Sequence, residues 1–268
     1  MDQNHPLIEI VIPVHNEEAQ LEQSVTTLRS YLLRNFPYSF RITIADNAST
    51  DNTPLIAAQM QARYPAEVRS LRLERKGRGL ALRTAWNQSQ AGVVSYMDVD
   101  LSTELAAFLP LVAPLVTGKS DIAIGSRLAR GATVTRSLKR EVISRVYNAL
   151  IKLLFFNRFS DAQCGFKAAR AEAGAERRKR LLPLIENDNW FFDTELLLLA
   201  EHNGLLISEV PVRWVEDPDS RVKLGSTIKE DLRGLWRMRR AFWRGEGQLE
   251  PQASSRSGLG PATARRQP

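Results

Sequence analysis

The amino-acid sequence predicts an α/β fold organised around a mostly parallel sheet. Short apolar, β-branched runs alternate with helical segments through the first half of the chain, and short loops join them. Polar residues directly follow several of these runs. Parallel strands need right-handed crossovers, and such sheets bind ligands at the carboxyl ends of their strands. The 268 residues, 43% of them hydrophobic and 25% charged, suit a globular protein of this class.

Five strands are predicted in the first half, because five short apolar runs each end at a polar turn. They cover residues 7–14, 40–45, 68–73, 92–97 and 122–124. Helices are expected between them. Apolar residues recur at helical spacing from Leu21 to Leu32, and the further helices cover residues 54–63, 77–90 and 105–115.

The second half is less regular and is predicted to end in a basic helix and a disordered tail. Helices are expected at residues 138–156, 171–184 and 193–203, a loop or short strand at 161–167, and a strand at 205–214. Thr227 and Glu230 have the spacing of a capping box, which predicts a helix from there to about Arg244. The predicted division is a main domain at residues 1–225, an amphipathic basic helix at 226–245 and a tail rich in Gly, Pro, Ser, Gln and Arg at 246–268.

Composition excludes several classes of protein. One cysteine excludes a disulfide framework and a Cys-rich zinc site, and three scattered histidines exclude the common His-based metal motifs. No basic segment precedes the first apolar run, so no signal peptide is expected. The longest weakly polar stretch, residues 105–116, is shorter than the roughly 20 residues of a membrane span. We therefore expect a soluble or peripheral protein in the cytoplasm.

Positive charge is concentrated in two segments. The net charge is +7, while residues 127–152 hold seven basic residues and one acid, and residues 221–245 hold eight basic residues and two acids. This distribution favours an anionic partner such as a nucleotide, a lipid headgroup or a nucleic acid. No nucleic-acid-binding motif is present, and acids at the strand ends would repel phosphates, so we expect no nucleic-acid partner.

Three polar residues, His15, Asp46 and Asp98, mark the ends of predicted strands. In an extended segment Asp98 and Asp100 point the same way, and two hard oxygen ligands suit Mg²⁺ or Mn²⁺. The alternative is a solvated loop or a helix cap. Asp46 can accept a hydrogen bond from a base or a ribose, or can form a turn before the next helix. The segment from Lys76 to Gly79 can contact phosphate or ribose, although it is neither a P-loop nor a dinucleotide fingerprint.

The order of these motifs resembles a known family. The segments are IVIPVHNEE, ADNASTDNT, KGRG, DVDLS, GSR, DAQCGFK, NWFFDTELL, VPVRW and SRVKL. Together they resemble the family-2 glycosyltransferases of GT-A fold, which is a Rossmann-like nucleotide-sugar-binding fold, and more closely the dolichyl-phosphate mannose and glucose synthases. The resemblance runs from about residue 7 to residue 240, and DAQCGFK and FFDTELL look more like the glucosyl branch.

The resemblance implies a role for individual residues. For the nucleotide it implies Pro13, His15, Glu17, Asp46, Lys76, Gly77 and Asp98, and for a divalent metal it implies Asp98 and Asp100. Relatives often carry Tyr at position 15, a second Asp at position 47 and Gln or Gly at position 102. His15, Asn47 and Ser102 are therefore departures, and stacking at His15 is expected to differ.

The resemblance also implies acceptor and catalytic residues. Arg127, Asp161, Lys167, Arg221 and Lys223 would contact the acceptor or the phosphates, although Arg127 could instead form a surface ion pair. Asp193 would orient the sugar or the acceptor, with a role as base second. Asp193 and Glu195 could also be acidic residues that interact with a helix N-terminus. The aromatic residues before them are predicted to lie in the core and not to stack on a sugar; they are Trp190, Phe191 and Phe192.

The reaction implied is an inverting, metal-dependent hexosyl transfer to a polyprenyl phosphate, with glucose from UDP-glucose favoured. GDP-mannose as donor, a soluble acceptor and an inactive scaffold are the alternatives. The last helix carries an apolar stripe flanked by arginines, which is typical of a helix on anionic lipid but also fits packing on the domain. We expect peripheral attachment to the cytoplasmic face of a membrane.

Overall fold

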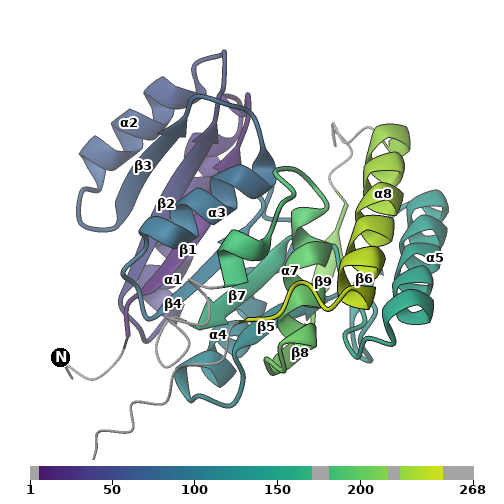
Figure 1. Cartoon of the computed structure of the whole chain (residues 1–268). Helices are drawn as coiled ribbons and strands as arrows, with labels where there is room; N and C mark the ends of the chain where they lie inside the picture. The colour runs from purple at the N-terminus through teal and green to yellow at the C-terminus, as the bar shows by residue number, and fades with distance from the viewer. Residues whose placement is uncertain (1–5, 171–180, 217–223, 250–268) are drawn as a thin grey trace, which may run out of the picture.

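The computed structural model describes residues 6–170, 181–216 and 224–249, and it forms a central sheet with helices on both faces (Figure 1). The strands of the main sheet are β1 Ile8–Val14, β2 Phe40–Asn47, β3 Val68–Leu73, β4 Val93–Met97, β5 Ile122–Ser126, β7 Phe166–Arg170 and β8 Ile207–Pro211. The helices are α1 Leu21–Asn35, α2 Thr53–Arg63, α3 Arg78–Gln88, α4 Phe108–Val116, α5 Leu138–Phe155, α7 Phe192–His202 and α8 Leu224–Trp243. Two 3₁₀ turns cover Leu105–Ala107 and Leu182–Leu184.

Within the described part of the chain, the main sheet has seven strands in the order β3-β2-β1-β4-β7-β5-β8. All neighbours are parallel except β7, which runs antiparallel to both β4 and β5 and separates them. A small second sheet pairs β6 Thr133–Thr135 with β9 Arg213–Val215. The predicted mostly parallel α/β fold is confirmed.

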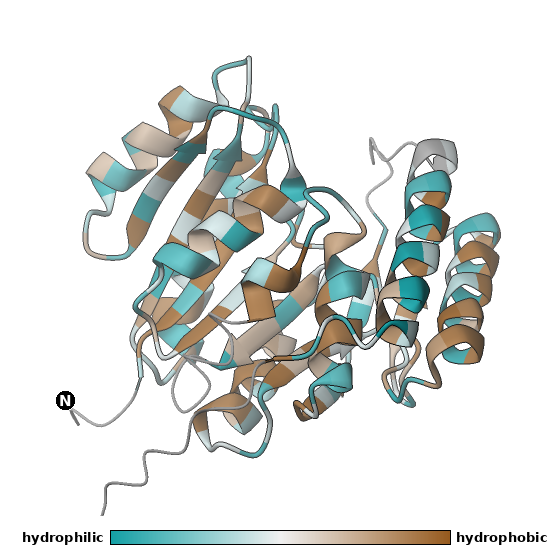
Figure 2. Cartoon of the chain, in the orientation of Figure 1, coloured by the Kyte–Doolittle hydropathy of each residue, from teal (hydrophilic) through white to brown (hydrophobic). Residues whose placement is uncertain are grey.

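The core lies in two layers, one on each face of the sheet. Side chains alternate along β1, so that Ile10 joins the layer covered by α1, α2 and α4, while Val11 joins the layer covered by α3, α5, α7 and α8. Figure 2 shows apolar colour along the strands of the sheet. Helices on both faces explain why these strands read as nearly continuous apolar runs.

Two predictions about the second half differ from the structure, and one is made more specific by it. The segment 161–167, predicted as a loop or short strand, is a loop that leads into β7, a strand within the main sheet. The single strand predicted at 205–214 is two strands in two sheets, β8 and β9. The predicted capping box is wrong, because α8 begins at Leu224 and Thr227 lies inside it, while Glu230 accepts a hydrogen bond from Asn187.

The predicted divisions of the chain fall at places that the structure only partly describes. The border at residue 225 lies within α8. Residues 246–249 of the predicted disordered tail pack on α7, where the Asn203 side chain bonds the Gly247 carbonyl and the Leu249 amide. Residues 250–268 and most of the helix predicted at 171–184 lie outside the described residues. No helix in the described part of the chain is long and apolar enough to cross a bilayer.

Candidate active site at the strand ends

The ends of β1 and β2 form one side of the candidate site. His15 Nδ1 lies 2.9 Å from the Asn47 carbonyl oxygen, which joins the two strand ends. The Asp46 side chain is buried, and its Oδ1 accepts the Ser49 amide at 3.0 Å. Its Oδ2 has no hydrogen-bond partner among the described residues and lies 3.7 Å from Arg72 Nε. A buried carboxylate oxygen beside a cation therefore has an acceptor position that no described residue fills.

The start of α3 is held against this side of the site. Asn47 Oδ1 accepts the Gly77 amide at 2.5 Å, and a Cβ on Gly77 would stand only 2.8 Å from the Asp188 carbonyl oxygen. Only glycine fits this approach. The exposed Lys76 is thereby fixed beside the β2 end. Pro13 pairs with Ala45 in the same sheet edge, and the Glu17 amide donates to Thr53 Oγ1 at 2.8 Å. The structure thus brings the six predicted nucleotide residues of β1, β2 and α3 to one edge of the sheet.

Arg78, the first residue of α3, joins two carboxylates from distant parts of the chain. Its Nη2 donates to Asp98 Oδ1 at 2.9 Å, and its Nη1 donates to Asp193 Oδ2 at 2.8 Å. The guanidinium also lies over the rings of Tyr96 and Trp190, 5.1 and 4.8 Å from their centroids. The end of β4 and the first turn of α7 are therefore held together through one buried cation.

The Asp193 carboxylate is enclosed by donors. Besides Arg78, its Oδ1 accepts the Tyr96 hydroxyl and lies 3.2 Å from Lys167 Nζ. Burial by itself would raise the pKa of Asp193, but Lys167 and Arg78 outweigh it and hold that pKa below its ordinary value. The side chain is only 4% exposed, against 40% for Asp98. Such a carboxylate is a poor proton acceptor and a firm support for its neighbours.

Asp98 and Asp100 are the candidate metal ligands. Asp100 Oδ1 accepts the Ser102 amide at 2.9 Å in a turn where Leu101 has a φ of 51°. Gly165 packs so closely on Asp98 that a Cβ there would lie 1.7 Å from Asp98 Oδ2. No cluster of three or more acidic, His or Cys side chains that could hold a metal occurs among the described residues. Two hard carboxylates fit Mg²⁺ or Mn²⁺ only if a bound ligand completes the coordination shell, as diphosphate oxygens do.

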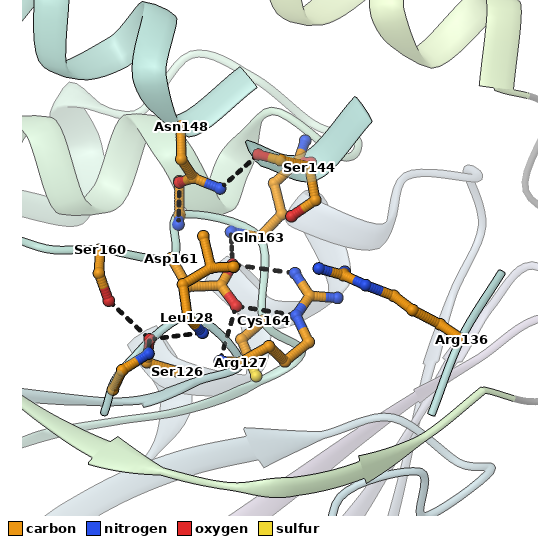
Figure 3. A network of polar contacts seen from close by, with 12 residues as sticks. Ser126, Arg127, Leu128, Arg136, Ser144, Asn148, Ser160, Asp161, Gln163 and Cys164 are labelled. Atoms are coloured by element: carbon orange, nitrogen blue, oxygen red, sulfur yellow. Dashed lines mark hydrogen bonds and ion pairs between the residues drawn. The ribbon is translucent and has the colours of Figure 1, made fainter. Parts of the chain in front are cut away.

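Arg127 and Asp161 form a buried ion pair at the end of β5 (Figure 3). The guanidinium donates from Nε at 2.8 Å and from Nη2 at 2.9 Å, and the Arg127 amide adds a third bond at 3.0 Å. This cation holds the pKa of Asp161 at about 2 despite burial, which acts to raise it. Arg136, which is paired with Glu141, points its guanidinium toward Arg127. The guanidinium groups of Arg127 and Arg136 therefore lie near each other at the end of β5.

The structure differs from the predicted picture at several residues. Arg127 forms an ion pair, as the alternative held, but a buried one. Lys167 is fully buried, and its ammonium bonds the Cys164 carbonyl at 2.6 Å and the Tyr96 hydroxyl at 3.2 Å, so here it supports the site without reaching a ligand. Arg221 and Lys223 lie outside the described residues.

Two residues were missed by sequence reasoning. Arg78 stands in the segment that supplied Lys76 and Gly77, but nothing local indicates that its partners come from β4 and α7. Arg136 belongs to the first basic segment, from which only Arg127 was predicted as a site residue. In both cases the signal was the residue type, and the missing information was the tertiary partner.

Curated proteins and solved structures resemble the chain over most of its length. Glycosyltransferase AglD of Haloferax volcanii is 33% identical over 239 residues, which are 86% of this chain but 37% of that protein. A dolichyl-phosphate beta-glucosyltransferase of Drosophila melanogaster is 30% identical over 230 residues, covering 80% of this chain and 69% of that one. The chain thus spans little more than a third of AglD.

The fold has a close structural counterpart. Glucosyl-3-phosphoglycerate synthase of Mycobacterium tuberculosis, in complex with Mn²⁺, UDP-glucose and phosphoglyceric acid, superposes with a TM-score of 0.62 at 21% identity, over 87% of this chain and 80% of that one. At that identity the likeness shows the GT-A fold. The sequence profile of glycosyl transferase family 2 matches residues 9–176, which include the strand-end carboxylates and the Arg127–Asp161 pair. The chain therefore belongs to glycosyltransferase family 2.

Proposed function

We propose that the enzyme transfers glucose from UDP-glucose to a polyprenyl phosphate with inversion at the anomeric carbon. The observation that carries the proposal is the enclosed Asp193, whose carboxylate has three donors and a lowered pKa. An acceptor hydroxyl needs a base to remove its proton, whereas a phosphate acceptor is already an anion at neutral pH. Positioning and charge neutralisation then dominate catalysis. Relatives named dolichyl-phosphate beta-glucosyltransferases support the same acceptor class.

The nucleotide is assigned to the edge formed by β1, β2 and the start of α3. Asp46 Oδ2 would accept the imide N–H of uracil, and Arg72 beside it would face a base carbonyl. The exposed Lys76, with Arg75 next to it, would lie along the nucleotide. A guanine base also offers N–H donors and a carbonyl, so this geometry supports a nucleotide sugar without distinguishing the base. The preference for uridine comes from the resemblance of the sequence to the glucosyl branch.

The metal is assigned to Asp98 and Asp100, together with the diphosphate of the donor. A bound Mg²⁺ or Mn²⁺ supplies charge neutralisation for the departing nucleoside diphosphate. Arg78 would support the metal site indirectly. Its bond to Asp98 Oδ1 orients that carboxylate and balances its charge. Asp193 in turn fixes Arg78, which is the positioning role that we assign to it.

The acceptor phosphate is assigned to the region between Arg127 and Arg136. Asp161 engages Nε and Nη2 of Arg127, which sets the plane of the guanidinium, and Nη1 is the nitrogen that we assign to the phosphate. The phosphate oxygen attacks the anomeric carbon from the face opposite the leaving diphosphate. An α-linked donor sugar then gives a β-linked product.

A peripheral seat on the membrane is assigned to the outer faces of α5 and α8, which lie side by side at one edge of the molecule (Figure 1). Most of the exposed large hydrophobic side chains lie on them, or directly after α5. They are Leu138, Val142, Val146, Leu153, Phe156, Ile228, Leu232, Trp236 and Trp243. The exposed cations Lys139, Lys152, Arg233, Arg239 and Arg240 belong to the same helices. An apolar face bordered by cations and tryptophans fits an anionic bilayer, where the acceptor resides. Its cytoplasmic side stays a prediction.

The deciding experiment is a transfer assay with labelled UDP-glucose or GDP-mannose, Mn²⁺, and polyprenyl phosphate in anionic vesicles. We expect lipid-linked label from UDP-glucose only, and loss of it in Arg127→Ala but not in Arg63→Ala, a surface arginine on α2. Phosphoglyceric acid replaces the lipid in a parallel reaction. Label in that soluble product, with none in lipid, would overturn the polyprenyl assignment and favour a soluble phosphorylated acceptor.

A further inference from the structure

The loop of residues 161–165 carries both sides of the candidate site. At its start, Asp161 holds the Arg127 guanidinium through two side-chain bonds. At its end, Gly165 lies directly against the Asp98 carboxylate. A small displacement of this loop therefore moves the predicted acceptor ligand and a predicted metal ligand together.

The middle of the loop is held from behind by two helices. Asn148, on the buried side of α5, accepts the Ala162 amide through Oδ1 at 2.9 Å. Asp231, on the buried side of α8, accepts Gln163 Nε2 through Oδ2 at 2.8 Å. These are the same two helices whose opposite faces expose apolar side chains. Leu232, which follows Asp231 directly, is on the exposed side of α8.

Asp231 is an expensive residue for the fold. It is buried on α8, and its Oδ1 has no hydrogen-bond partner among the described residues. Burial raises the pKa of Asp231 to about 7, the Gln163 bond opposes this, and the charges of Glu230 and Asp193 add to it. A folded-state pKa above the ordinary value of 3.8 means that the ionised carboxyl destabilises the fold at neutral pH. Core packing alone would be served better by an apolar side chain.

We propose that Asp231 and Asn148 are positioning residues for the transfer reaction, which fix the 161–165 loop from α8 and α5 and so orient Arg127 and Asp98. The reaction itself rests on the proposed function, whereas the effect on the loop does not. Because the outer faces of α5 and α8 are the proposed bilayer seat, the two contacts also connect that seat to the site. Vesicle binding is then expected to order the loop.

The first test separates positioning from folding. Asp231→Ala removes the acceptor of the Gln163 bond, and we expect kcat to fall by roughly 10- to 100-fold with little change in KM for UDP-glucose. Asp231→Asn keeps an acceptor oxygen and should restore most of kcat. Both variants should melt at or above the wild-type temperature at pH 8, because the cost of the buried carboxylate is gone. An equal loss of kcat in both variants, or a lowered melting temperature that accounts for the loss, would overturn the proposal.

The second test needs no substrate. Hydrogen exchange at the amides of residues 161–165 should accelerate in Asp231→Ala and Asn148→Ala, and should stay unchanged in Glu22→Ala, a surface variant on α1. Anionic vesicles should slow this exchange in the wild type and less in Asp231→Ala. Unchanged exchange of the loop amides in both Asp231→Ala and Asn148→Ala contradicts the proposal. If the wild type transfers no glucose to lipid, the proposed function fails while this measurement still decides the loop contact.

Discussion

The two buried arginines of the site differ in how they use their charge. Arg127 gives two nitrogens to one carboxylate, that of Asp161, which lies 34 residues further along the chain in the loop before β7. Arg78 divides its two nitrogens between Asp98 and Asp193, which are 95 residues apart in the chain. The Arg127–Asp161 pair is a closed pair, because each partner is satisfied by the other. Arg78 is the only described bridge between Asp98 and Asp193, so its removal should affect both carboxylates.

The largest effect is therefore expected at Arg78. Arg78→Ala leaves the buried Asp193 with fewer donors and Asp98 without its cation, and breaking a buried pair costs about 3–5 kcal/mol. We expect loss of that size in urea unfolding and activity below detection. Arg78→Lys should recover part of the stability but not the fork between the two carboxylates. Arg63→Ala, which breaks an exposed pair with Glu22, serves as the control and should leave the urea unfolding curve almost unchanged. Equal effects of Arg78→Ala and Arg63→Ala would contradict the bridge.

The next effect tests the site without replacing either arginine. Gly165→Ala places a Cβ against the Asp98 carboxylate, which is a side chain and can rotate away. We expect activity to fall by about 100-fold, because a predicted metal ligand is displaced. Stability should fall by less than in Arg78→Ala, because only the Arg78 bond to Asp98 is disturbed and the bond to Asp193 remains. Gly225→Ala, whose Cβ would meet nothing within 4 Å, is the matched control. Retained activity in Gly165→Ala would show that Asp98 need not occupy its present position.

The Arg127–Asp161 pair should make the free energy of unfolding depend on pH. The folded-state pKa of Asp161 is about 2, below its ordinary value of 3.8. The stabilisation is therefore fully present above pH 3.8 and is lost as pH falls toward 2, and the difference corresponds to about 2 kcal/mol. Asp161→Asn should be less stable than the wild type at pH 7, and its unfolding free energy should fall less between pH 5 and pH 2. Parallel curves for the two proteins would show that Asp161 titrates normally.

The smallest effect is expected at Cys164, in the same loop. Burial raises the pKa of its thiol to about 12, so the reactive thiolate is scarce at pH 8. Iodoacetamide should leave the native protein unlabelled and active, while urea-unfolded protein should react fully. Rapid labelling of the native protein would mean that the 161–165 loop opens readily. The Arg127–Asp161 pair would then not hold this loop closed, and it would be no more self-supporting than the Arg78 bridge.

The sequence predicted the strands of the first half and the helices α5 and α7 of the second half well, but it did not predict how the later strands pair, for a physical reason. In β1 to β4 each strand and its helix are consecutive, so local periodicity and turn residues are sufficient. The strand β7 pairs with β4 and β5 across distances of about 40 to 75 residues, and no local signal places it there. The capping-box pattern at Thr227 does not mark the helix start, because α8 already includes Leu224.

The site divides in the same way. Asp46 and Asp98 follow directly from strand ends, where the chain direction alone brings them together. The partners of Arg78, Asp161 and Asp231 come from separate segments, and pairing between distant segments cannot be read from one sequence. Residue types and motifs therefore named many participants, but the structure was needed to distinguish ligands from supports. Lys167 is the clearest case, since its ammonium is fully enclosed.

The position of β7 also bears on how the chain assembles during synthesis. Until residue 170 has left the ribosome, β4 and β5 lack the strand that joins them, and each presents an unpaired edge that is prone to aggregation. A fragment that stops before β7 therefore contains the predicted nucleotide and metal residues but an incomplete sheet. The order of synthesis makes β7 responsible for joining β5 to the earlier strands, and the loop of residues 161–165 is made directly before it.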